Sequence, residues 1–158
     1  MEEHERYMHL AIEQAEQAMN KGNHPFGALL VVDGQVVLTA QNTVITDKDV
    51  TQHAETALVS KACRTLEANI LQRAVLYTST EPCAMCSGAI YWARIPCVVY
   101  GCESAVLGQI AGDELAIPCK HVLSAGTVYK CEVIGPVLGD VAAEMHRKFW
   151  PVFNAKRK

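Results

Sequence analysis

The segment that decides the fold is Tyr77-Thr78-Ser79-Thr80-Glu81-Pro82-Cys83-Ala84-Met85-Cys86, where a predicted strand passes into a predicted helix. The β-branched and aromatic residues of Val75–Thr78 are typical of a strand. Pro82 favours the first turn of a helix, because its ring fixes a helical φ and its missing N–H would have no partner there. We therefore expect a helix over Cys83–Arg94 with both thiols, Cys83 and Cys86, on one side of its first turn.

Four elements are expected on the N-terminal side of this segment. Apolar residues at three- and four-residue steps predict a helix over Glu3–Met19. Two β-rich runs, Phe26–Val32 and Gln35–Ala40, flank the turn signal Asp33-Gly34, which predicts an antiparallel hairpin. After the polar stretch 41–51, apolar residues at helical spacing predict a second helix over His53–Leu66.

Two strands and two helices are expected on the C-terminal side. The strands are Cys97–Tyr100 and Val128–Val133, and the residues between them suffice for a helical crossover, which would make these strands parallel. A final helix over Asp140–Phe149 is expected to end before Pro151. No repeat or linker marks a boundary, so we expect one α/β domain over residues 1–158, with three α/β/α layers around a five-stranded mixed sheet.

Composition excludes several classes of protein. The 158 residues are 50% hydrophobic, and fourteen Lys and Arg against seventeen Asp and Glu give a net charge of −3, whereas a nucleic-acid-binding domain is usually basic. No apolar run approaches the roughly 20 residues that span a bilayer, so no membrane partner is expected. The acidic first residues do not resemble a secretory signal, and the cysteine count, seven, is odd. These features indicate a cytoplasmic protein with free thiols or metal ligands.

Two short motifs fall at the starts of neighbouring predicted helices and together suit a catalytic zinc site. His53, Cys83 and Cys86 supply one imidazole and two thiolates, a tetrahedral set that leaves the fourth position open to water. Glu55 would close the site as a fourth ligand and is better interpreted as a proton shuttle. One Zn²⁺ per chain would lower the pKa of its water from 15.7 toward about 7 and so supply hydroxide.

Two other interpretations of the cysteines fit the sequence less well. A thioredoxin-like redox pair would leave His53 and Glu55 without a role. A closed structural zinc site would need a fourth ligand, and no pair among the candidates for it has ligand spacing; they are His24, His121, Cys97, Cys102 and Cys119. The cysteines outside the motif are expected to be small buried hydrophobes; they are Cys63, Cys97, Cys102, Cys119 and Cys131.

The His-x-Glu and Pro-Cys-x-x-Cys motifs resemble those of the zinc-dependent nucleobase deaminases of the cytidine and deoxycytidylate deaminase superfamily. Within it, the chain is most similar to bacterial guanine deaminases and next to tRNA adenosine deaminases, from the first helix to about Leu115. The stretches that carry the resemblance are 24–28 (HPFGA), 41–42 (QN), 51–55 (TQHAE) and 77–94 (YTSTEPCAMCSGAIYWAR). The resemblance implies a cytidine-deaminase-like fold and the hydrolytic deamination of a purine base, guanine to xanthine plus ammonia.

The resemblance also implies substrate contacts. By motif, Phe26 stacks on the purine, Asn42 hydrogen-bonds it, and the backbone of Ala54 contacts it. A further acid that binds the purine falls on Asp113 or Glu114, although the sequence 111–118 (AGDELAIP) departs from the family pattern around it. From the residues alone, Phe26 also fits a core position, and Asn42 also fits a turn that bonds its own backbone.

Charge distinguishes the candidate partners. Residues 1–146 carry nine basic and seventeen acidic side chains, a balance of −8, whereas residues 147–158 carry five basic side chains and no acid. A path for RNA across the acidic part is therefore not expected, and a small purine or related heterocycle is favoured. The alternatives are tRNA adenosine, cytosine or another aminated heterocycle, and a non-catalytic zinc-binding scaffold. The resemblance implies a homodimer.

Overall fold

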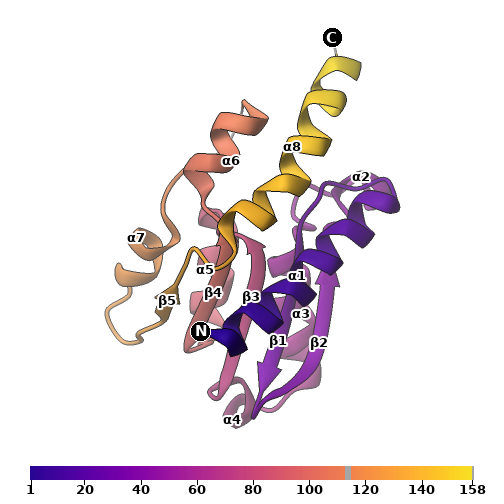
Figure 1. The fold of residues 1–158 in the computed structure, drawn as a ribbon. Coiled ribbons are helices and arrows are strands. Elements are labelled where there is room, and N and C mark those ends of the chain that lie inside the picture. Colours follow the sequence, from indigo (N-terminus) through magenta and orange to yellow (C-terminus); the bar gives the residue numbers. More distant parts are fainter. Residues whose placement is uncertain (113–114, 158) are drawn as a thin grey trace.

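A five-stranded sheet forms the middle layer of the molecule, with helices on both faces (Figure 1). The computed structural model describes residues 1–112 and 115–157. Its elements are α1 (Glu2–Asn20), β1 (Gly27–Val32), β2 (Gln35–Gln41), α2 (Val44–Asp47), α3 (Ala54–Thr65), α4 (Ala68–Leu71), β3 (Ala74–Thr80), α5 (Ala84–Trp92), β4 (Cys97–Cys102), α6 (Ser104–Ala111), α7 (Cys119–Ser124), β5 (Glu132–Ile134) and α8 (Gly139–Lys156).

The sheet is mixed, as the sequence predicts. Its order is β2-β1-β3-β4-β5, with β1 antiparallel to both of its neighbours and β4 parallel to β3 and β5. The β1–β2 hairpin turns at Asp33 and Gly34, whose φ values of 50° and 76° are the left-handed values that a two-residue hairpin turn favours. The α/β class, the five strands and the three layers are thereby confirmed.

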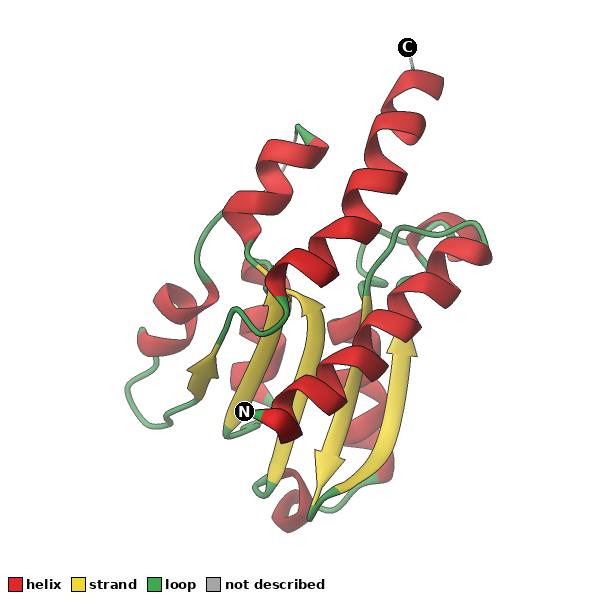
Figure 2. Ribbon diagram, viewed as in Figure 1, coloured by secondary structure: helices red, strands yellow, loops and turns green. Residues whose placement is uncertain are grey.

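Helices α1 and α8 cover one face of the sheet (Figures 1 and 2). Tyr7 and Met8 of α1 are buried in one cluster with residues of β1, β3 and β4. Gly27 permits a close approach of α1 to β1, because a Cβ at this position would lie 2.3 Å from the backbone nitrogen of Ala15. Helix α8 packs on β4 and α6 through Ala142 and Ala143.

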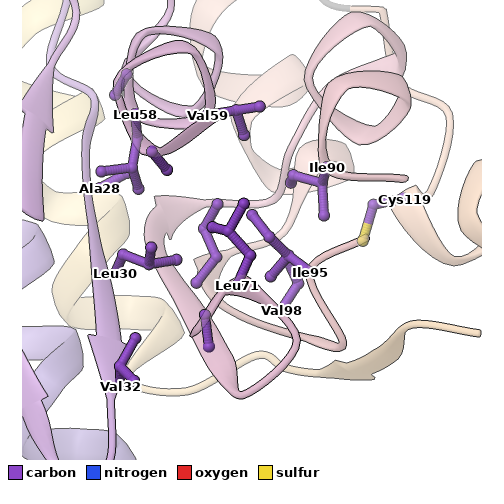
Figure 3. Packing of buried hydrophobic residues seen from close by; sticks show 14 of the residues in the cluster. Ala28, Leu30, Val32, Leu58, Val59, Leu71, Ile90, Ile95, Val98 and Cys119 are labelled. Carbon is purple, nitrogen blue, oxygen red and sulfur yellow. The ribbon is translucent and has the colours of Figure 1, made fainter. Parts of the chain in front are cut away.

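The other face carries the larger core. Leu58 of α3 and Ile90 of α5 pack with Leu30 and Val98 of the sheet (Figure 3). Leu123 of α7 belongs to the same cluster. All five side chains are almost fully buried. Burial of this kind stabilises by about 1.5–3 kcal/mol per large aliphatic side chain. It therefore fixes α3 and α5 side by side, with both helices starting at the same end of the sheet.

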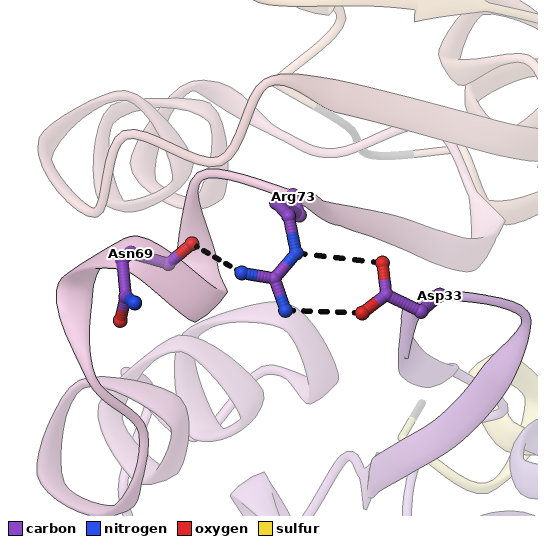
Figure 4. Close-up of polar contacts among 3 residues, drawn as sticks. All are labelled: Asp33, Asn69 and Arg73. Atoms are coloured by element: carbon purple, nitrogen blue, oxygen red, sulfur yellow. Dashed lines mark hydrogen bonds and ion pairs between the residues drawn. The ribbon is translucent and has the colours of Figure 1, made fainter.

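At the opposite end of the sheet, an exposed ion pair joins two neighbouring segments of the chain. Arg73 donates to Asp33 through Nη2 at 3.0 Å and Nε at 3.4 Å, and its Nη1 donates to the Asn69 carbonyl (Figure 4). The pair links the hairpin turn to the start of β3. Because both side chains are exposed, solvent screens the attraction and the pair contributes little to stability.

The last helix corrects one prediction. Helix α8 continues through Pro151 to Lys156, whereas the sequence predicted an end at Phe149. Pro151 is exposed, so the carbonyl that loses its partner in the helix can turn to water. The turns beyond it are held by tertiary contacts: the Phe153 ring packs on His24, and Asn154 donates a hydrogen bond to the Ala111 carbonyl at 2.9 Å.

Other boundaries also differ from the predictions. The last strand is shorter than Val128–Val133, because β5 pairs only with residues 97–99 of β4. Stretches without a periodic signal contain the short helices α2 and α4, and the predicted crossover contains two helices, α6 and α7. Burial is confirmed for Cys102 and Cys119. Cys97 and Cys131 are only partly buried, and Cys63 is exposed, so the expectation was wrong for Cys63. Within the described part of the chain, no helix has the length and apolar character needed to cross a membrane.

Candidate active site

The predicted metal ligands meet where α3 and α5 begin. His53 and Cys83 are the residues that immediately precede these two helices, and Cys86 lies in the first turn of α5. The packing of α3 against α5 brings the motifs together although about thirty residues separate them in the sequence. The partial positive charge of a helix N-terminus also favours thiolate over thiol at the cysteines.

The spacing of the three ligand atoms fits a zinc ion. Nδ1 of His53 lies 3.6 Å from Sγ of Cys83 and 3.4 Å from Sγ of Cys86. Zinc bonds of about 2.3 Å to sulfur and about 2.05 Å to nitrogen, at tetrahedral angles, give a nitrogen–sulfur separation of about 3.6 Å. Among the His, Cys, Asp and Glu side chains that the structure describes, these three form the one group close enough to share a metal. Glu55 is outside that group.

The two thiols are strongly coupled. The hydrogen bond between them lowers the pKa of Cys83 to about 4, with a further contribution from His53. The same hydrogen bond and burial raise the pKa of Cys86. Cys83 is therefore the thiolate of the pair at neutral pH, and binding of a cation would displace the proton of Cys86.

Glu55 is positioned as a buried carboxyl group beside the ligands. It lies in the first turn of α3 and its exposed fraction is 4%. Burial raises its pKa, and hydrogen bonds from Thr78 and Cys86 oppose that rise. Thr78, in β3, was not singled out from the sequence, because a threonine within a strand carries no signal of its own. The arrangement suits a group that takes up and releases a proton.

A cavity of about 680 Å³ opens beside the ligands. It contains two of the residues that the resemblance assigned to substrate binding, Phe26 and Asn42. The Asn42 Oδ1 accepts a hydrogen bond from the Val44 N–H at 3.1 Å, so this residue makes the expected local turn and also lines the cavity. Ala54 has a fully buried side chain and lies outside the lining. Its backbone N–H is in the first helical turn, where amides have no partner within the helix.

The last turns of α8 form a wall of the cavity that sequence reasoning missed. Trp150, Phe153, Asn154 and Arg157 line it together with His24. Trp150 and Phe153 are three residues apart and therefore share one side of the helix. This spacing was a usable signal, but the predicted helix end at Phe149 placed both residues outside the helix.

His146 of α8 links this wall to the sheet. Its Nδ1 accepts a hydrogen bond from Trp150 Nε1 at 3.0 Å, so its Nε2 carries the proton and donates to Thr80 Oγ1 at 2.7 Å. The ring also packs on Phe26, with ring centroids 5.0 Å apart. Burial lowers the pKa of His146 to about 4. A neutral histidine thus orients the Trp150 ring.

Glu81 holds the loop that presents the cysteines. Its Oε1 accepts hydrogen bonds from the N–H and the hydroxyl of Ser104, and its Oε2 accepts one from the Cys119 N–H, at 2.8–3.0 Å. It thus ties the loop before Cys83 to the starts of α6 and α7. The predicted substrate acids Asp113 and Glu114 lie outside the described residues; Leu115, which follows them, lines the cavity.

Comparison with known proteins agrees with this geometry. The family model of the cytidine and deoxycytidylate deaminase zinc-binding region matches residues 1–102. The chain is 43% identical to a guanine deaminase of Bacillus subtilis over 112 residues, which are 70% of this chain and 72% of that protein. It is 39% identical to a probable cytosine deaminase of Schizosaccharomyces pombe (91% and 90% of the two chains) and 40% identical to a tRNA-specific adenosine deaminase of B. subtilis (100% and 95%).

A solved structure shows the same fold. The guanine deaminase of Nitrosomonas europaea superimposes with a TM-score of 0.81 at 22% identity, over 93% of this chain and 84% of that one. The predicted resemblance and the predicted zinc cofactor are confirmed. The chain belongs to the cytidine and deoxycytidylate deaminase family and is a zinc-dependent nucleobase or nucleoside deaminase.

Proposed function

We propose that this chain deaminates a purine base, converting guanine and water to xanthine and ammonia. The observation that carries the proposal is the position of Glu55, buried beside His53, Cys83 and Cys86 next to a cavity that Phe26 lines. The similarity to a guanine deaminase supports guanine, because the 112 matched residues are 43% identical.

His53, Cys83 and Cys86 would hold the zinc ion in this proposal. The bound ion supplies the Lewis acidity that makes water a nucleophile at neutral pH. Glu55 accepts one proton of the attacking water and delivers it to the neighbouring ring nitrogen. It then accepts the second proton, from the hydroxyl group newly bound to the ring carbon, and passes it to the amine, which departs as ammonia. Thr78 holds the Glu55 carboxyl group in place while it exchanges protons.

The remaining residues would bind and orient the ring. Phe26 offers an aromatic face for stacking against the purine. Asn42 already uses its Oδ1 to accept from Val44, which leaves its Nδ2 to donate to a carbonyl or ring nitrogen of the base. The backbone N–H of Ala54 and an acid at Asp113 or Glu114 complete the proposed contacts. We also propose the homodimer that the resemblance implies.

Two relatives define the competing substrates. The probable cytosine deaminase matches 91% of this chain and the tRNA-specific adenosine deaminase matches all of it. The acidic charge of residues 1–146 disfavours RNA, because Lys and Arg contacts to phosphates supply the electrostatic part of the affinity for RNA. Cytosine is therefore the second candidate, and RNA is the third.

An ammonia-release screen tests the substrate. The zinc-containing protein is incubated with guanine, guanosine, adenine, adenosine, cytosine, cytidine, pterins, aminotriazines and an anticodon stem-loop RNA, with Glu55→Gln as the matched inactive control. We expect release from guanine that is absent in the control. Release from cytosine or from the RNA, with none from guanine, would show that the proposed substrate is wrong, while release from none of the compounds would contradict deamination itself.

A further inference from the structure

His24 occupies an unusual position on the cavity wall. It lies in the loop between α1 and β1, and its ring is surrounded by three aromatic rings of α8. The centroid distances are 5.8 Å to Phe149, 5.1 Å to Trp150 and 5.3 Å to Phe153, and two of the three contacts are edge-on. These contacts fix the imidazole beside Phe26 and Asn42, which line the same cavity.

The imidazole of His24 has no hydrogen-bonding partner within residues 1–112 and 115–157. Burial lowers its pKa, and the nearby His53 and Arg157 lower it further, so the ring is neutral at pH 7. A neutral imidazole has one N–H donor and one nitrogen acceptor. His24 is partly exposed and lines the cavity, so its ring nitrogens can hydrogen-bond water there. A ligand that fills the cavity displaces this water, and a polar atom of the ligand then has to take over the hydrogen bond.

We propose that His24 is a substrate-binding residue that hydrogen-bonds a polar atom on the edge of the heterocycle, and that the last turns of α8 hold it in position for this contact. The inference rests on the proposed function and adds a specificity-determining residue to it. It also gives a role to the part of α8 beyond Pro151, because Phe153 belongs to the ring cluster around His24. The ligand class is an aminated heterocycle with a hydrogen-bonding edge, for which purines qualify.

The test separates hydrogen bonding from packing. His24→Phe keeps an aromatic ring inside the cluster and removes both polar atoms, whereas His24→Gln keeps a donor and an acceptor and removes the ring. His121→Phe, at an exposed position of α7 outside the cavity lining, is the matched control. Each change is made in the Glu55→Gln protein, so that binding is measured without turnover. The probe is 8-azaguanine, a purine analogue, and its Kd is measured by calorimetry at pH 7.5 with zinc content and Tm recorded.

We expect His24→Phe to raise the Kd for 8-azaguanine about 5- to 100-fold, the cost of leaving one polar atom of the ligand unpaired. His24→Gln should recover part of that loss, and His121→Phe should leave the Kd unchanged. Equal Kd values for His24→Phe and its parent, a failure of His24→Gln to recover affinity, or no binding by the parent would each overturn the assignment. Failure of the proposed function would appear separately, as an absence of ammonia release by the protein with Glu55 intact.

Discussion

The buried His146 should make the stability of this protein fall as the pH falls below neutral. Its exposed fraction is 1%, and burial lowers its pKa from an ordinary value of 6.5 to about 4. Between pH 6.5 and about 4, His146 therefore binds a proton in the unfolded chain but stays neutral in the folded chain. The stabilisation is complete above pH 6.5 and is lost as the pH falls toward 4.

The size of the effect follows from the difference between the two pKa values. Each pKa unit corresponds to about 1.4 kcal/mol, so His146 alone should lower the free energy of unfolding by about 2 kcal/mol at pH 5 and about 3 kcal/mol at pH 4. His146→Gln offers a donor for Thr80 and an acceptor for Trp150 but does not titrate. The comparison between the two proteins therefore isolates the contribution of His146 from those of His24, Glu55 and the zinc ligands.

The assay is urea unfolding of both proteins at pH 7.5 and pH 5.0. We expect the wild-type protein to lose about 2 kcal/mol more than His146→Gln between the two pH values. Trp150 fluorescence should also change with pH in the wild-type protein, because protonation of Nδ1 removes the acceptor of its indole N–H. An equal loss of stability in the two proteins would refute the reasoning, since it would show that His146 titrates alike in the folded and unfolded chains.

Three further changes test contacts that hold the fold together. Glu81→Gln should lower the free energy of unfolding by about 2–3 kcal/mol in urea titrations, because its amide group would point a donor at the Cys119 N–H. An unchanged urea midpoint would show that Glu81 does not stabilise its loop. Gly27→Ala should cost about 3 kcal/mol or more, since its Cβ would meet the backbone of α1 at 2.3 Å, and calorimetry would measure the fall in Tm. Arg73→Ala should leave Tm nearly unchanged, because solvent screens its ion pair with Asp33.

Much of the fold could be predicted because its signals are local. The Asp33-Gly34 turn requires left-handed backbone values that these residue types tolerate, and the observed φ values agree. The end of α8 could not be predicted in this way. A proline usually ends a helix, and only the tertiary contacts of Phe153 and Asn154 show why the helix continues past Pro151.

In the candidate site, too, residues with a local sequence signal could be predicted, and residues that depend on tertiary contacts could not. The zinc-type donors could be predicted because two thiols and an imidazole in those motifs have few other roles, and their ligand atoms lie close together as expected. Thr78 and His146 could not be predicted, because a threonine in a strand and a histidine in a helix acquire their roles only from partners distant in the sequence. Trp150 was not identified as a cavity residue, because the last helix was predicted to end before Pro151.

The central claim is that Glu55 moves protons while three other side chains hold the zinc. The most direct test measures zinc content and ammonia release on the same samples of wild-type protein and Glu55→Gln, with each compound of the substrate screen. We predict one zinc per chain in both proteins and a fall in the rate of ammonia release of about 10²- to 10⁴-fold, or more, in the variant. Loss of zinc from Glu55→Gln, or ammonia release at the wild-type rate, would contradict the assignment of Glu55.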